Sequence, residues 1–179
     1  MQIHPHSEYE HITHRHSEEG LRRLLTRLIK KMQRDKLVRE TMNQLRESLQ
    51  VDRLILYYFY EQWQGQVTFE SLSSQEFSIL GSTGEDDCFN DNYAALYLAG
   101  RVRAIADIEI EPIETCHRDF LRSMQVRANL VVPILTPTGL WGLLAAHQCQ
   151  ETRLWSPLDI ELMQTAARTL ETSPYIIES

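Results

Sequence analysis

The segment from residue 128 to residue 147 restricts the fold more than any other part of the chain. Two apolar runs, 128–135 (ANLVVPIL) and 140–147 (LWGLLAAH), are separated by the four residues TPTG at 136–139. Proline and glycine in such a spacer are typical of a tight turn. We therefore expect a β-hairpin here, which means that the fold contains an antiparallel sheet.

Further strands are expected before this hairpin. Residues 51–60 (VDRLILYYFY) are dense in β-branched and aromatic side chains, which favours a central strand. A second strand is expected over 67–71, after a turn over 62–66 centred on Gly65, and a short element over 76–80. Residues 102–108 alternate apolar and polar side chains, which indicates a strand or an extended segment.

Apolar side chains recur at helical spacing at both ends of the chain. Residues 18–49 carry such a stripe, which predicts one long helix or two helices with a break near Asp35. A final helix is expected after Trp155, because Ser156 is a good N-cap and Pro157 suits the first turn. Shorter helices are expected over 90–99, which would end at Gly100, and over 116–124.

The order of these elements describes an α+β fold, an antiparallel sheet with helices packed on one face. The length of 179 residues suits one domain with a full hydrophobic core. We expect a polar, histidine-rich and loosely ordered leader over 1–17, a single domain over 18–174 and a short tail over 175–179.

Composition excludes several classes of function. The net charge of -7 argues against a nucleic-acid partner, which would need a basic footprint. We find neither an apolar run of roughly 18 residues nor a signal peptide, so the chain is expected to be soluble and cytoplasmic, with no membrane span. Three cysteines are an odd number and lie far apart in the sequence, which makes a disulfide framework improbable.

Two of the three cysteines lie in dense polar motifs. Asp86-Asp87-Cys88-Phe89 is followed 28 residues after its cysteine by Cys116-His117. A thiolate is a nucleophile that can form a stable thioether, and a second thiol could add reversibly to the same ligand. That combination suits a covalently bound, switchable chromophore. Each cysteine could instead be a small buried residue, and Cys149 is interpreted as structural.

The strand sequences 126–134 (VRANLVVPI) and 140–149 (LWGLLAAHQC), followed by Arg-Leu-Trp at 153–155, resemble those of a GAF domain. More narrowly, they resemble the bilin-binding GAF domains of cyanobacteriochromes, which are photoreceptors related to phytochromes. Residues 86–89 match the Asp-x-Cys-Phe signature of a two-cysteine subfamily. The resemblance implies a linear tetrapyrrole, phycocyanobilin or phycoviolobilin, in a pocket on the sheet face opposite the terminal helices.

The resemblance also implies unequal roles for the two cysteines. Cys116 would be the permanent thioether anchor on ring A, with His117 against the pyrrole nitrogens. Cys88 would add reversibly to the central methine bridge and switch the pigment between a blue- or violet-absorbing state and a green-absorbing state. The resemblance also places other residues around the bilin. Asp86 would lie near the pyrrole N–H groups or near Cys88, Arg101 and Arg103 would bind the propionates, and His147 would lie near the end that isomerises. Tyr97 and Phe89 would also contact the bilin.

The function implied is that of a light sensor rather than an enzyme, which passes a signal to an output domain fused or downstream. The apolar stripe of the first helix is expected either to pair with a second copy of the chain in a homodimer or to cover the chain's own sheet. Three alternatives were weighed. One is a GAF domain that binds a cyclic nucleotide or another small effector, which would not require two such cysteines. Another is a zinc site, for which the sequence lacks the usual paired local ligands. The last is a thiol redox sensor, in which the cysteines would have to approach one another.

Overall fold

Five strands form one sheet in the computed structural model, which describes residues 6–83 and 88–179. The strand order is β2-β1-β5-β4-β3, and every neighbouring pair is antiparallel. The strands are β1 (Arg53–Glu61), β2 (Gln64–Leu72), β3 (Arg103–Ile105), β4 (Ala128–Thr136) and β5 (Gly139–Gln148). The hairpin expected from the sequence is β4–β5, and it supplies two of the three central strands.

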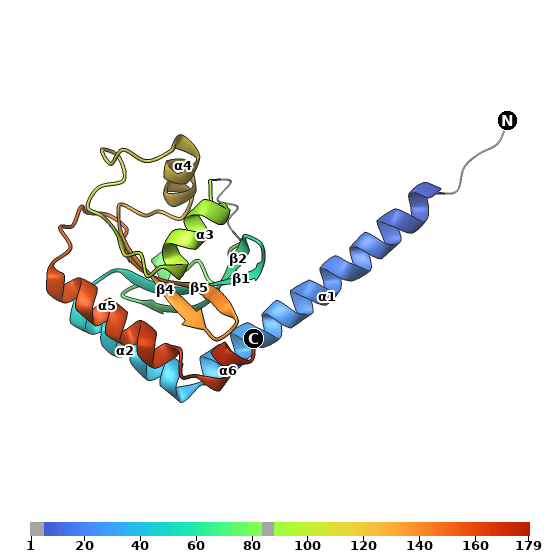
Figure 1. Cartoon of the computed structure of the whole chain (residues 1–179), viewed down its shortest axis with the longest axis horizontal. Coiled ribbons are helices and arrows are strands. Elements are labelled where there is room, and N and C mark those ends of the chain that lie inside the picture. Colours follow the sequence, from blue (N-terminus) through green and yellow to red (C-terminus); the bar gives the residue numbers. More distant parts are fainter. Residues whose placement is uncertain (1–5, 84–87) are drawn as a thin grey trace.

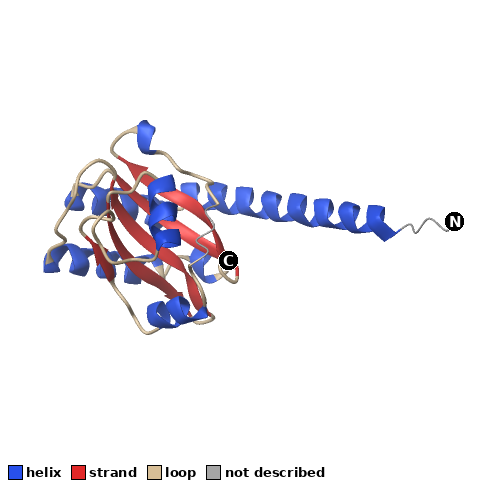
Figure 2. Cartoon of the chain, turned by 90° about the horizontal axis from the view of Figure 1, so that it is seen from above, coloured by secondary structure: helices blue, strands red, loops and turns tan. Residues whose placement is uncertain are grey.

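Helices cover the two faces of this sheet unequally. The helices α2 (Lys36–Leu49) and α5 (Pro157–Leu170) lie side by side on one face, as Figures 1 and 2 show. The shorter helices α3 (Asp91–Leu98) and α4 (Thr115–Ser123) lie on the other face (Figure 1). The α+β fold, with the terminal helices gathered on one face, is therefore confirmed.

Alternation along the strands separates two cores. Leu54 and Leu56 of β1 are fully buried against α2 and α5, whereas Ile55 and Tyr57 face the opposite side. Successive side chains of a strand point to opposite faces, so one apolar strand can serve both layers. The larger core belongs to the α2–α5 side, and the smaller one leaves space below α3 and α4.

The expected break in the first helical region falls at Asp35. α1 (His6–Arg34) ends there, and the Asp35 carboxylate caps α2 by accepting hydrogen bonds from the backbone N–H groups of Leu37 and Val38. α1 begins at His6, so the expectation of a loosely ordered leader up to residue 17 was wrong for residues 6–17. No glycine or proline interrupts residues 6–19, so nothing in the sequence stops the helix.

Two further expectations need correction. The chain turns at Gln62 and Trp63, and Gly65 lies within β2, where a Cβ atom would sit 2.2 Å from the Tyr57 ring. That glycine serves close packing instead of a turn. The expected tail contains α6 (Pro174–Ile177), whose Ile176 is fully buried in the main core. The element expected within 76–80 is a 3-10 helix, η1 (Gln75–Phe77).

α1 leaves the body of the molecule and projects well beyond it (Figures 1 and 2). Near Asp35 its apolar stripe packs against its own chain, because Leu25 and Met32 are buried. Leu24 lies farther round the helix and is 62% exposed. Among the described residues, none of the helices combines the length and the apolar character needed to cross a membrane.

Candidate ligand-binding pocket

A cavity of about 240 Å³ lies on the sheet face that carries α3 and α4. The strands line it through alternate residues, which is the pattern expected of one sheet face. These lining residues are Ile55, Tyr57 and Phe59 of β1, Asn129 and Val131 of β4, and Leu143, Ala145 and His147 of β5. The cavity therefore rests on the three central strands of the sheet.

Most of the residues that the sequence nominated come together at this cavity. Phe89, Tyr97, Arg101, Arg103, His117 and His147 all line it. Cys88 directly precedes the lining residue Phe89, and Cys116 precedes the lining residue His117. Asp86 lies outside the described residues.

The two motif cysteines meet beside the cavity. Cys88 and Cys116 form a disulfide, with their Cα atoms 6.0 Å apart, although 28 residues separate them in the sequence. The expectation from cysteine number and spacing that a disulfide is improbable was therefore wrong for this pair. The turn before α3 brings Cys88 to the first turn of α4, a contact between distant segments that sequence spacing does not reveal.

An aromatic wall closes one side of the cavity. Phe89 lies parallel to Tyr97, with 6.0 Å between the ring centroids, and its ring is 5.0 Å from that of Phe59. The guanidinium of Arg101 lies over the rings of Tyr93 and Tyr97, at 5.6 and 5.9 Å. Such contacts hold a cation against the wall, where it can meet a ligand carboxylate.

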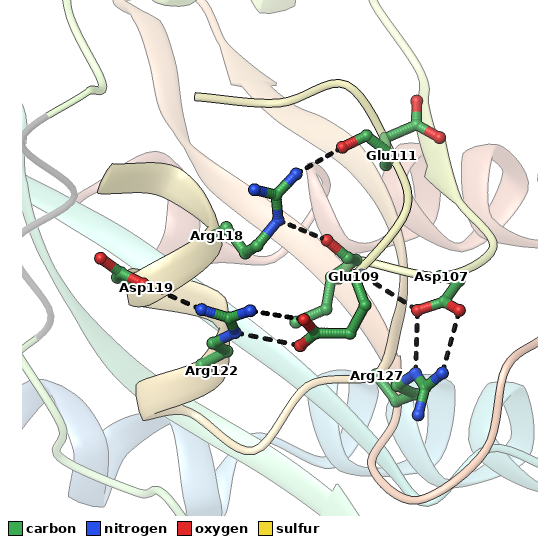
Figure 3. Close-up of polar contacts among 8 residues, drawn as sticks. Asp107, Glu109, Glu111, Arg118, Asp119, Arg122 and Arg127 are labelled. Carbon is green, nitrogen blue, oxygen red and sulfur yellow. Dashed lines mark hydrogen bonds and ion pairs between the residues drawn. The ribbon is translucent and has the colours of Figure 1, made fainter. Parts of the chain in front are cut away.

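Ion pairs hold the segment that leads into α4. Figure 3 shows Arg127 paired with Asp107 and Arg122 paired with Glu109, while Arg118 donates hydrogen bonds to the backbone oxygens of residues 108 and 111. The Arg127–Asp107 pair is bidentate, at 2.8 and 2.9 Å. Arg118 and Arg122 belong to α4 and tie it to the loop over 106–114, while Arg127 directly precedes β4 and holds the same loop.

The same loop contributes Pro112, Ile113 and Glu114 to the cavity. Its Glu111 also forms an ion pair with Arg103, at 3.1 Å, with both side chains about one quarter exposed. Arg103 therefore already holds a carboxylate beside the cavity. The network positions the first turn of α4, and with it both Cys116 and His117.

A buried arginine lies against His147, which lines the cavity. Arg53 is fully buried; its Nε atom donates a hydrogen bond to His147 Nδ1 at 3.1 Å, and other guanidinium N–H groups donate to the backbone oxygens of Phe77 and Met124. Burial, and then the nearby positive charge of Arg53, hold the pKa of His147 well below its usual value of 6.5. His147 is therefore a neutral imidazole at the cavity wall.

Sequence reasoning missed several residues of the site. Tyr57, Trp63, Tyr93 and Asn129 line the cavity, and Arg53 binds the lining residue His147, but none of them was nominated. One signal was present for Arg53, because it is a charged residue at the start of an otherwise apolar strand. The alternation of β1, β4 and β5 could have supplied the strand residues once one lining position was known.

Two tryptophans and the third cysteine lie away from the cavity. Trp141 is buried in the α2–α5 core, and Trp155 packs against the same core. Cys149 is a free thiol, and burial raises its pKa to about 11. Within residues 14–83 and 88–179, no group of three or more histidine, cysteine or acidic side chains is placed to hold a metal ion.

Comparison with known proteins defines the class. The GAF domain model matches residues 33–173, so the chain belongs to the GAF domain family. Within that family it is similar to the blue-light-absorbing form of the PixJ GAF domain of Thermosynechococcus elongatus, at 36% identity and a TM-score of 0.65, over 74% of this chain and 83% of that one. It is also similar to a phycocyanobilin-bound GAF domain from a cyanobacterial phytochrome, at 27% identity and a TM-score of 0.67, over 82% and 91% of the two chains.

Curated relatives differ widely in length. An uncharacterized protein of Picosynechococcus is 50% identical over 153 residues, which cover 86% of this chain and 94% of the relative. A putative methyl-accepting chemotaxis protein of Synechocystis is 40% identical over 119 residues, which cover 66% of this chain and 12% of the relative. The chain thus spans almost all of one relative and about an eighth of the other.

Proposed function

We propose that this chain is a light-sensing domain that holds a linear tetrapyrrole covalently in the cavity over the sheet. The observation that carries the proposal is the meeting of two cysteines, His117 and two arginines around one aromatic-walled cavity. The similar solved GAF domains include one named as phycocyanobilin-bound and one named as blue-light-absorbing. The protein is then a sensor without catalytic turnover.

Cys116 is the proposed permanent anchor. Its S–H adds across the double bond of the ring A side chain, so that a C–S bond forms and the proton goes to the neighbouring carbon. No oxidant or reductant is needed. The ion-pair network fixes the first turn of α4, which favours attachment at one place. The neighbouring imidazole of His117 faces the cavity, where it can exchange a proton or hydrogen bond with pyrrole nitrogens.

Cys88 is the proposed reversible nucleophile. Its Cα atom lies 6.0 Å from that of Cys116, which supports the idea that both thiols reach the same ligand. The sulfur of Cys88 bonds to the carbon of the central methine bridge, a π bond of that bridge is lost, and the thiol proton goes to a pyrrole nitrogen. The carbon becomes tetrahedral and the conjugated system is divided. Absorption then moves to the blue or violet. Light-driven rotation of ring D expels the thiol and restores a green-absorbing state.

Arg101 and Arg103 are the proposed partners of the two propionates. Arg101 lies over the aromatic wall, and Arg103 is already paired with the carboxylate of Glu111. A propionate that takes the place of Glu111 would keep that guanidinium neutralised. The pigment is proposed to be phycocyanobilin, phycoviolobilin or both.

The signal is proposed to leave through the terminal helices toward an output domain. α1 and α6 meet on the body of the molecule, close to the joint at Asp35 (Figure 1). A homodimer through α1 stays a prediction, and the exposed Leu24 is consistent with it. The mass measured by sedimentation equilibrium distinguishes one copy from two.

The test is co-expression with a bilin-synthesis system, followed by denaturation in acid. We expect the colour to remain on the denatured chain, because the pigment is bound covalently. A colourless product would contradict the proposal. Cys116→Ala should lose most of the stable pigment, because the anchor is gone. Cys88→Ala should keep the pigment and lose the short-wavelength state. Cys149→Ala is the matched control, and it should leave both spectra unchanged.

A thiol redox sensor is the second candidate, since the structure brings Cys88 and Cys116 into a disulfide. The two functions make different demands on these thiols. If the cysteines serve a pigment, the bilin-free chain oxidised with glutathione disulfide should attach no bilin until a dithiol reductant frees Cys116. Cys88→Ser cannot form the disulfide, so without added glutathione disulfide it should attach bilin with no reductant present. A wild-type chain that stays colourless under both conditions would favour the redox function.

A further inference from the structure

The outer side of α1 carries a dense row of positive charge. Residues 20–34 hold six of the 18 basic side chains of the chain and none of its 25 acidic ones. All six are exposed, and together we call them the basic stripe: Arg22, Arg23, Arg27, Lys30, Lys31 and Arg34. The rest of the chain carries a large excess of acidic side chains. Charge is thus divided sharply between this helix and the body of the molecule.

Packing decides which way the basic stripe points. Leu25 and Met32 of the same helix are buried against the chain. With 3.6 residues per turn, these two side chains fall on one side of α1, and most of the basic stripe falls on the other. The stripe therefore faces away from the body, along a helix that projects beyond it (Figures 1 and 2). A flat partner can approach the stripe from that open side.

The basic stripe has no countercharge of its own. None of its six side chains forms an ion pair with the described residues, whereas Arg103, Arg122 and Arg127 are each paired with a carboxylate. Within the stripe, Arg23 and Arg27 are one of several like-charged pairs four residues apart. Such pairs repel one another and destabilise a helix. An anionic partner replaces this repulsion by attraction.

An exposed apolar side chain borders the basic stripe. Leu24 is 62% exposed and precedes Arg27 by three positions and Lys31 by seven, so all three lie on one face of α1. The phosphate backbone of a nucleic acid offers charge to such a face but no apolar layer for the leucine. A bilayer with anionic headgroups offers both. A cluster of about four to eight basic residues on an amphipathic helix is typical of proteins that bind anionic lipids.

We propose that the basic stripe docks on an anionic lipid surface, with Leu24 entering the headgroup layer. The same surface repels the acidic body, so the chain docks through α1 and holds the body away from the lipid. The attachment is peripheral and reversible, because it rests on screened charge and one apolar side chain. It needs no pigment, so it stands or falls independently of the proposed light-sensing function.

Co-sedimentation of the whole, bilin-free chain with vesicles tests the docking. We expect binding to vesicles of phosphatidylglycerol and phosphatidylcholine in equal parts, and binding at least about tenfold weaker to phosphatidylcholine alone. Binding to the anionic vesicles should fall steeply between about 50 and about 500 mM salt, because salt screens the attraction. A chain that binds both kinds of vesicle equally, or neither, would overturn the proposal.

Neutral substitutions locate the docking surface. Arg27→Gln combined with Lys30→Gln should weaken binding to the anionic vesicles about tenfold or more, because each cation near such a surface contributes a factor of about five. The matched control is Arg39→Gln combined with Arg168→Gln, which removes the same charge from exposed positions of α2 and α5. An equal loss in the two variants would show that net charge alone matters and would refute the basic stripe.

The melting temperature separates weak binding from poor folding. Arg27→Gln combined with Lys30→Gln removes like-charged neighbours, so the melting temperature of this variant should be equal to that of the wild type or higher. A lower melting temperature together with weaker binding would assign the stripe a structural role instead.

Leu24→Ser distinguishes a bilayer from other partners. It should weaken binding to the anionic vesicles roughly fivefold, because an apolar side chain no longer enters the lipid. The control is Leu158→Ser, at a leucine of α5 that is 61% exposed. Tighter binding of the wild type to duplex DNA than to the vesicles at equal salt would refute lipid as the partner. A mass in solution that halves in Leu24→Ser would assign this leucine to a pair of helices and remove it from the docking.

Discussion

Burial gives Cys149 a different chemistry from the two cysteines beside the cavity. Its thiol is half-buried near the end of β5, and this desolvation is the main cause of a pKa of about 11. The nearby guanidinium of Arg53 opposes the shift only in part. Since the thiolate is the reactive form, Cys149 is inert near neutral pH.

Alkylation measures this difference. At a pH of about 8, iodoacetamide should modify Cys149 of the folded chain roughly a hundredfold more slowly than the same thiol in urea, because far less thiolate is present. The rate in the folded chain should rise about tenfold per pH unit and level off only above a pH of about 11. Mass spectrometry of the peptide over time gives both rates. Equal rates in the folded and unfolded chains would contradict the raised pKa.

The contrast between the motif residues and the strand residues shows what the sequence could predict of the site. Cys116 and His117 are adjacent in the chain and carry a family resemblance, so they could be nominated. Asn129 and Arg53 are placed by partners far away in sequence, His147 and Met124 among them. Cross-strand register is a property of the folded sheet, so these placements could not be predicted from spacing.

At the scale of elements, charge ties α4 to the loop that precedes it. The hydrogen bond from Arg127 holds the pKa of Asp107 below its ordinary value of 3.8, and that from Arg122 likewise lowers the pKa of Glu109. A carboxyl group whose folded pKa is depressed stabilises the fold fully above its unfolded pKa. That contribution is lost as the pH falls through the folded value.

Acid should therefore loosen this part of the molecule. The melting temperature should fall as the pH is lowered from about 5 to about 3, and Asp107→Asn should show a smaller fall because its side chain no longer titrates. The amide oxygen of that variant can still accept from the N–H of Glu109, which Asp107 binds at 3.0 Å. Identical pH profiles for the two proteins would show that the pair with Arg127 contributes no pH-dependent stability.

Elements with strong periodicity were predictable, and those decided by packing were not. The β4–β5 hairpin and α5 follow from apolar pattern, turn residues and the Ser156 cap, which forms a full capping box with Asp159. β3 has only three residues, because the chain leaves the edge of the sheet after Ile105. The role of Gly65 depends on the ring of Tyr57 across the β1–β2 pair, which local sequence does not contain.

For the whole molecule, a buried hydrogen bond joins the joint between α1 and α2 to the segment between α5 and α6. Ser173, between α5 and α6, donates its Oγ proton to Asp35 Oδ2 at 2.6 Å, and Ser173 is fully buried. The other oxygen of the same carboxylate caps α2. Asp35 therefore connects the joint between α1 and α2 to the C-terminal segment.

Loss of this hydrogen bond should lower the stability of the whole fold. Ser173→Ala leaves Asp35 Oδ2 without its hydroxyl donor, and we expect the free energy of unfolding to fall by about 1–3 kcal/mol. Urea denaturation followed by circular dichroism measures the change. Ser123→Ala is the control, because that exposed hydroxyl bonds only the nearby backbone oxygen of Phe120. A loss no greater than that of the control would show that the bond does not stabilise the fold.

The part of α1 that precedes the buried Leu25 is a lever, and its fulcrum lies where the helix meets the body. Its 19 residues, from His6 to Leu24, at about 1.5 Å of rise each, give an arm of about 28 Å. A tilt of only about 5° at the fulcrum would sweep the far end through about 2.5 Å, about half the rise of one helical turn. Angular changes too small to disturb the sheet would thus reach the tip of α1 as movements of molecular size.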